Sequence, residues 1–286
     1  MLGRLEMDVD ECIHAYTTLS QTIFSKKESR FGLGFKGNLK AKFSSQRLRE
    51  GIETVLKERG VPLEEAFNDG QTGKSRECRV FVCSCDRANK DIVRLKSYDI
   101  PGKAGPLNAP SIIQVALATS AAPQFFDRVN IDDVIYLDGA LGANNPVKQV
   151  ASEAADIWFE EEGDPGLQTN IKCFLSIGTG HPGVNPVKDE KAFKFLSTTL
   201  VQMATDTQQT ASEFADFWRG PLDNGRYFRF DVQHGLQEVG LEEYKKKGDI
   251  QSMTRSYLAE RENQQSVRDC VKQLKDKQSV SAIDFS

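Results

Sequence analysis

Apolar residues recur every three to four positions in two stretches near the start of the chain, and this spacing predicts two amphipathic helices. The first helix is expected to begin just after Asp8, which forms a capping-box pattern with Glu11. The second is expected over residues 45–59. The apolar positions of the two patterns are Val9, Cys12, Ile13, Tyr16, Leu19 and Ile23, and then Leu48, Ile52, Val55 and Leu56.

Short apolar, β-branched runs separated by turn residues predict the strands. These runs are residues 79–85, 92–98, 133–137, 172–177 and 227–232. Helices are expected over 111–119, after Asn145-Pro146, and twice in the stretch from 249. In the helix after Pro146, the inner face is predicted to be Ala151, Ala154, Ala155 and Trp158. Strands alternating with helices are typical of an α/β sandwich with a largely parallel sheet.

No strand pattern precedes the first helix, although the first strand of an α/β domain normally lies at the centre of its sheet. We therefore expect the first strand of the fold to be missing. A sheet without that strand is expected to be less stable than a complete one and to associate through its unpaired edge.

Composition narrows the class of protein. The 286 residues are 39% hydrophobic and 27% charged, which suits one domain, 1–286, with a helical C-terminal segment at 249–286 packed on it. A net charge of −4 gives no electrostatic footprint for nucleic acid. Six scattered cysteines and no signal peptide favour a reducing, cytoplasmic location. No apolar run approaches the length of a membrane span.

Four motifs occur in order along the middle of the chain. They are ATSAAP at 118–123 followed by Phe125-Phe126, then Asp138-Gly139-Ala140, then Asn144-Asn145-Pro146, and LSIGTG at 175–180. Together they resemble patatin-like phospholipases. The resemblance extends over essentially the whole chain, including residues 1–13, 204–214 and 227–232. Where the family commonly has Arg before ATSAAP, this chain has Ala116-Leu117, which is expected to affect local packing or binding.

The resemblance implies a three-layer patatin-like sandwich with a mainly parallel central sheet. It also implies that a glycine-rich oxyanion loop and a G-x-S-x-G nucleophile elbow would precede Met1, and no G-x-S-x-G occurs in the sequence. Family chemistry is lipid acyl ester hydrolysis of the phospholipase A type by a Ser-Asp dyad. Asp138 matches the family aspartate, and Gly139 and Ala140 form its turn. An isolated Asp-Gly would more often be an ordinary loop cap, but the surrounding motifs favour the catalytic reading.

The resemblance further implies a phospholipid or other acyl-lipid substrate, transient contact with membrane surfaces, and no metal or cofactor. Phe125 and Phe126 are candidates to face the acyl chain, although buried aromatic residues more often form core. No protein partner is indicated. The alternative function is a catalytically inactive remnant of the fold that binds lipid or protein.

Other motifs support weaker hypotheses. Residues 178–183 match G-x-G-x-x-G, but Pro182 and Pro186 oppose a dinucleotide-binding turn. Cys78, Cys83 and Cys85 lack a fourth ligand at zinc spacing. The family dyad gives His181 no role. Ser84 and Ser120 lack the flanking glycines of a nucleophile elbow and are expected to be packing residues.

Overall fold

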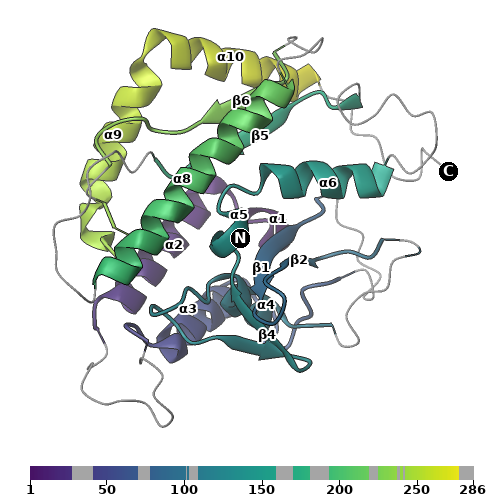
Figure 1. The fold of residues 1–286 in the computed structure, drawn as a ribbon, viewed down its shortest axis with the longest axis vertical. Coiled ribbons are helices and arrows are strands. Elements are labelled where there is room, and N and C mark those ends of the chain that lie inside the picture. Colours follow the sequence, from purple (N-terminus) through teal and green to yellow (C-terminus); the bar gives the residue numbers. More distant parts are fainter. Residues whose placement is uncertain are drawn as a thin grey trace. The chain divides into compact units, whose positions relative to one another are not determined.

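The computed structural model describes residues 1–27, 41–69, 78–100, 102, 109–158, 170–180, 193–218, 225–236, 239–240 and 242–276. For residues 193–205 only the helical backbone is described. The chain forms two compact units, Met1–Ala143 and Asn144–Ser286, each with its own elements (Figure 1). The prediction of one domain over 1–286 stays a prediction.

The helices of the first unit confirm most of the sequence patterns. They are α1 Leu2–Leu5, α2 Val9–Phe24, α3 Ser45–Glu58, α4 Ile112–Thr119 and α5 Ala140–Ala143. Asp8 and Glu11 form the expected capping box at the start of α2, and Ser111 and Gln114 form a second one on α4. The N-termini of both helices are therefore specified by local sequence.

The sheet of the first unit corrects the fold prediction. Its strands are β1 Phe81–Asp86, β2 Ile92–Lys96, β3 Val129–Ile131 and β4 Val134–Asp138, in the order β2-β1-β4-β3. All three pairings are antiparallel, so the prediction of a mainly parallel sheet is wrong for this sheet. For β3 and β4 the connection gives the reason: the two strands are joined by Asp132 and Asp133, both with positive φ, and so short a connection permits only antiparallel pairing.

The core of the first unit has two parts. Met7, which follows α1, packs with Ala15 of α2 and Val55 of α3. The second part is an aromatic cluster of Phe24 at the end of α2, Phe43 before α3, and Phe125 and Phe126 after α4. On α2 the predicted apolar positions divide between two faces. Ile23 is buried, whereas Val9, Ile13 and Tyr16 are each at least half exposed.

The second unit contains α6 Val147–Trp158, β5 Phe174–Ile177, α8 Phe193–Trp218, β6 Tyr227–Phe230, the 3₁₀ turn η2 Tyr244–Lys246, α9 Lys247–Ala259 and α10 Arg261–Asp276. Here β5 and β6 do pair in parallel. The core consists of aromatic side chains from β5, α8 and β6 around Val147. Trp158 is 37% exposed, so its predicted place on the inner face of α6 is wrong, and Glu153 is buried on that helix instead.

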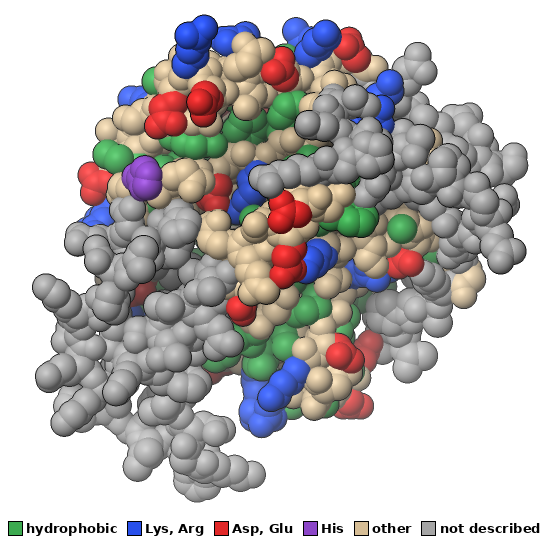
Figure 2. Space-filling view, turned by 45° about the horizontal axis from the view of Figure 1, so that its top comes forward, with side chains coloured by type: hydrophobic (Ala, Val, Ile, Leu, Met, Phe, Trp, Pro, Cys, Tyr) green, Lys and Arg blue, Asp and Glu red, His purple; other side chains and the backbone are tan. Residues whose placement is uncertain are grey.

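The described surface mixes both signs of charge. Basic and acidic side chains are interspersed over the face shown in Figure 2. Among the helices described for this chain, none is both long enough and apolar enough to cross a bilayer.

Candidate active site

Asp138 is the last residue of β4, and hydrogen bonds hold both its backbone N–H and its side chain. Its N–H donates to the Ala121 carbonyl at 3.1 Å, which ties the strand end to the ATSAAP segment. Its Oδ1 accepts from the Ala140 N–H at 2.8 Å, two residues further on. This side-chain contact closes the turn and leads directly into α5. One carboxylate oxygen is thus fixed, while the other accepts no hydrogen bond from the described residues.

Burial raises the pKa of the Asp138 carboxyl above its ordinary value, and the Ala140 N–H opposes that rise. Burial disfavours the charged form, so the carboxylate is a stronger base than an aspartate in water. A general base is more effective when its pKa lies nearer the working pH. The environment of Asp138 therefore suits proton abstraction, although structural carboxylates can also be perturbed in this way.

Gly139 lies against the backbone of β1. A Cβ at this position would be 2.2 Å from the Cys83 carbonyl oxygen and 2.5 Å from its carbon. Real Cβ atoms do not approach backbone this closely, so only glycine permits the turn as it stands. Ala140 follows as the first residue of α5 and supplies the N–H that fixes Asp138. The three residues act together as one tight strand-to-helix passage.

Phe125 and Phe126 lie in the aromatic cluster of the first unit. The Phe125 ring stacks on Phe43 at 5.9 Å between centroids, and Phe126 lies 6.2 Å from the same ring. They are 2% and 9% exposed. Both rings therefore contribute to the core, and their contact with an acyl chain stays a prediction.

The serines set aside as nucleophiles are placed differently. Ser84 is fully buried within β1, and its hydroxyl is directed at backbone carbonyls. Ser120 is the C-cap of α4. Neither lies on a strand-to-helix elbow of the kind that exposes a nucleophilic serine. The interpretation of Ser84 and Ser120 as non-nucleophilic agrees with this placement.

The three cysteines rejected as zinc ligands on their spacing differ in exposure. Cys83 and Cys85 are buried in β1, whereas Cys78 is exposed. Burial raises the pKa of the Cys83 thiol to about 11, with the charge of Arg94 opposing the rise, so it stays protonated at neutral pH. Within the described ranges, no three His, Cys, Asp or Glu side chains come together as metal ligands.

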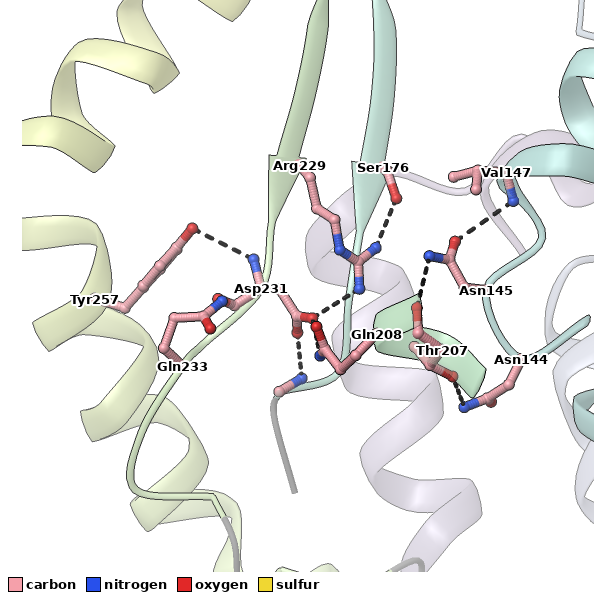
Figure 3. Close-up of polar contacts among 11 residues, drawn as sticks. Asn144, Asn145, Val147, Ser176, Thr207, Gln208, Arg229, Asp231, Gln233 and Tyr257 are labelled. Carbon is pink, nitrogen blue, oxygen red and sulfur yellow. Dashed lines mark hydrogen bonds and ion pairs between the residues drawn. The ribbon is translucent and has the colours of Figure 1, made fainter. Parts of the chain in front are cut away.

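The glycine turn after β5, at Gly178 and Gly180, lies against the carboxylate of Asp231. Asp231, just beyond the parallel strand β6, accepts from the Gly180 N–H at 2.8 Å, and a Cβ on Gly178 would lie 2.3 Å from its carboxylate (Figure 3). The side chain therefore occupies the space in which a phosphate would approach these glycines. This placement opposes the dinucleotide hypothesis, whose remaining residues, 181–183, and His181 with them, lie outside the described residues.

Asp231 is also the centre of a polar network that sequence reasoning missed (Figure 3). It pairs with Arg229 at 2.7 Å and accepts from Gln208 of α8 at 3.4 Å. The adjacent Thr207 accepts from Asn144 at 2.7 Å. The network thus joins four motifs of the second unit: the Asn-Asn-Pro turn, the glycine turn, the middle of α8, and the end of β6.

Comparison with known proteins identifies the family to which these motifs belong. Residues 3–151, more than half of the chain, match the model described as "Patatin-like phospholipase". The chain belongs to the patatin-like phospholipase family. The matched residues include the whole Asp138 turn, residues 138–140.

Among curated proteins, this patatin-like chain is similar to "Calcium-independent phospholipase A2-gamma" of Mus musculus, with 26% identity over 246 residues. The human protein of that name is 25% identical over 248 residues. Both matches cover 81% of this chain but only 28% of the relative. "Phospholipase A I" of Arabidopsis thaliana is 30% identical over 121 residues, 41% of this chain and 8% of that protein. The chain therefore spans less than a third of the length of these relatives.

Proposed function

We propose that this chain carries the general base of a lipid acyl hydrolase, and that Asp138 is that base. The observation that carries the proposal is the state of its carboxylate. It is partly buried, its pKa is raised, one oxygen is fixed by the Ala140 N–H, and the other accepts no hydrogen bond from the described residues. An oriented carboxylate with one available oxygen is what a base needs to receive a proton.

In the proposed reaction, Asp138 takes the proton of a serine hydroxyl as the serine attacks the ester carbonyl. Backbone N–H groups of a glycine-rich loop stabilise the oxyanion, and Asp138 gives the proton to the alcohol as it leaves. Asp138 then takes a proton from the water that attacks the acyl-serine and returns it to the serine oxygen as the fatty acid is released. The serine and the loop would be supplied from outside the 286 residues, because the sequence contains no G-x-S-x-G. Gly139 and Ala140 shape the turn that presents the carboxylate.

The substrate proposed is a phospholipid or another acyl lipid, reached by transient contact with a membrane surface. Membership of the family and the names of the mouse and Arabidopsis relatives support this choice. The proposal includes a cytoplasmic location, no metal or cofactor, and the three-layer arrangement of the family fold over a single domain.

A second candidate is a catalytically inactive domain that binds lipid or protein. The absence of G-x-S-x-G from the 286 residues favours it. The two candidates differ in whether Asp138 has a serine to activate, so they are separable by measuring hydrolysis.

The test is p-nitrophenyl ester hydrolysis by the 286-residue chain and by the same chain fused to a segment with the glycine-rich loop and a G-x-S-x-G elbow. Each is measured as wild type, Asp138→Asn and Asp133→Asn. Asp133 is an exposed aspartate in the β3–β4 turn, so its variant controls for the loss of a carboxylate. Activity in the fused protein that depends on Asp138 alone supports the enzyme. Activity in either protein that survives Asp138→Asn contradicts the role of Asp138, and an inactive but lipid-binding fused protein favours the second candidate.

A further inference from the structure

The peptide group between Leu137 and Asp138 is held at both ends by groups from other elements. Its carbonyl, on Leu137, accepts from the Ser84 hydroxyl at 2.7 Å. Its N–H, on Asp138, donates to the Ala121 carbonyl at 3.1 Å. Ser84 is opposite Asp138 in the antiparallel pairing of β1 with β4. The orientation of this peptide sets the direction in which the Asp138 side chain leaves the strand.

Ser84 is suited to hold that peptide because it has no exposure to solvent. Its oxygen lies 2.7 Å from the Leu137 carbonyl and 3.1 Å from the Ala118 carbonyl, and its one proton can be donated to either. A buried hydroxyl left without a partner is costly, so the side chain stays in this contact. Its presence in the buried part of β1 is therefore explained by the link between β1, β4 and α4.

Thr119, the last residue of α4, makes a similar contact with Cys83, the residue before Ser84 in β1. Its hydroxyl donates to the Cys83 carbonyl at 2.6 Å. This is the carbonyl against which Gly139 packs, since a Cβ on Gly139 would lie 2.2 Å from its oxygen. Thr119 thus fixes the surface on which the turn after Asp138 rests.

We propose that Ser84 and Thr119 are positioning residues for Asp138: the two hydroxyls hold the end of β4 and the surface of β1 so that the carboxylate stays in its orientation. The inference rests on the proposed role of Asp138 as the base. A displacement of about 1 Å in a catalytic group can cost on the order of 100-fold in rate, so positioning through two buried contacts has a functional consequence.

The test reads the state of Asp138 in the 286-residue chain and needs no hydrolysis. Carbon-13 NMR of labelled aspartate gives the pKa of Asp138, and hydrogen exchange gives the protection of its N–H. The variants are Ser84→Ala, Thr119→Val, which removes the hydroxyl at nearly constant shape, and Thr119→Ser, which retains it. Ser20→Ala is the matched control, because Ser20 is a buried serine of the same unit whose hydroxyl donates to the Tyr16 carbonyl in α2.

We expect Ser84→Ala and Thr119→Val to lower the pKa of Asp138 toward its ordinary value, since a released carboxylate becomes better hydrated. We also expect exchange of its N–H to rise at least about 10-fold, the change produced by about 1.4 kcal/mol. Thr119→Ser and Ser20→Ala should leave both readouts at wild-type values.

Wild-type readouts in Thr119→Val, or equal changes in Thr119→Val and Thr119→Ser, overturn the role of the Thr119 hydroxyl. Wild-type readouts in folded Ser84→Ala overturn that of Ser84. If Ser84→Ala does not fold, the threonine pair decides the proposal. Because neither readout depends on a serine nucleophile, this result is separate from the outcome of the hydrolysis test.

Discussion

At the scale of the residue, the environment that suits Asp138 for the proposed reaction also lowers the stability of the folded chain at neutral pH. Its pKa is raised in the folded state by burial. A carboxyl with a raised folded pKa favours the fold in its protonated form, and this contribution is lost as the pH rises through the folded pKa. At neutral pH the ionised side chain is therefore destabilising, as is common for residues kept for function.

This cost predicts that Asp138→Asn raises the melting temperature at pH 7. Asparagine keeps an oxygen for the Ala140 N–H but carries no charge to bury. The gain should shrink as the pH falls through the folded pKa and vanish below 3.8, the ordinary aspartate value, where both side chains are neutral. Differential scanning calorimetry of Asp138→Asn and Asp133→Asn across pH checks this. A gain for Asp138→Asn that does not depend on pH would contradict the account.

Gly139 gives a second prediction at this scale. Gly139→Ala should cost about 2–4 kcal/mol in the free energy of unfolding, because the added methyl meets the rigid Cys83 backbone. Gly142→Ala is the control: its methyl would meet side-chain atoms of Ile92, Cδ1 at 2.9 Å and Cγ1 at 3.2 Å, and no backbone within 4 Å, so it should cost less than about 1 kcal/mol. Urea unfolding measures both. Equal effects would show that the close approach at Gly139 is not what requires glycine.

At the scale of the element, the Asp231 network should be the most sensitive part of the second unit. Asp231→Ala leaves Arg229, whose side chain is only 15% exposed, without its carboxylate, and removes the acceptor of Gly180. Removing one partner of such a pair should cost roughly 3 kcal/mol. Glu213→Gln, which breaks the exposed pair with Lys148, should have no measurable effect. Similar unfolding curves for the two variants would show that the Asp231 network does not contribute more to the stability of the second unit than the exposed Lys148–Glu213 pair.

Elements with local signals were predictable from the sequence, and their pairing was not. The capping pattern of Asp8 and Glu11 located the start of α2 correctly, because a capping box depends on residues three apart, and the pattern over 111–119 located α4. The antiparallel sheet had one local signal: Asp132-Asp133 between two short apolar runs is a two-residue connection typical of a hairpin. The long helix α8 was missed, and the contacts of Thr207 and Gln208 join segments up to 63 residues apart.

The same distinction applies to the site. The Asp138 turn was visible as a motif, since a strand followed by Asp-Gly-Ala has a local signature. The contribution of Ser84 was not, because its partners are on α4 and β4, 34 and 53 residues away. A single serine in an apolar strand was the one available sign that a buried contact was needed.

At the scale of the whole molecule, the strand β5 of the second unit carries exposed apolar side chains. On β5, Leu175 is 40% and Ile177 is 73% exposed, and among the described strands β5 pairs with β6 alone. Parallel strands are normally buried on both faces, and an apolar edge strand tends to pair with another chain. We predict that association of this chain, where it occurs, involves β5.

Ile177→Lys should lower the fraction of associated protein, because a charged side chain on an edge strand opposes pairing. Leu258→Lys is the control, since Leu258 is also an exposed apolar residue, at 41%, but lies in the helix α9 and not in a strand. Size-exclusion chromatography with light scattering over a range of protein concentrations measures the fraction. The same decrease for both variants would point to general apolar contact rather than to β5.

The most direct test of the central claim is the pH dependence of kcat/KM for ester hydrolysis by the chain fused to a serine-bearing elbow, with and without Asp138→Asn. We predict an acidic limb whose pKa is raised above 3.8, as burial of Asp138 requires. We also predict a loss on the order of 1,000-fold in Asp138→Asn, within the range for removal of a general base. Retention of both the limb and the rate in Asp138→Asn would show that another group is the base and would contradict this account.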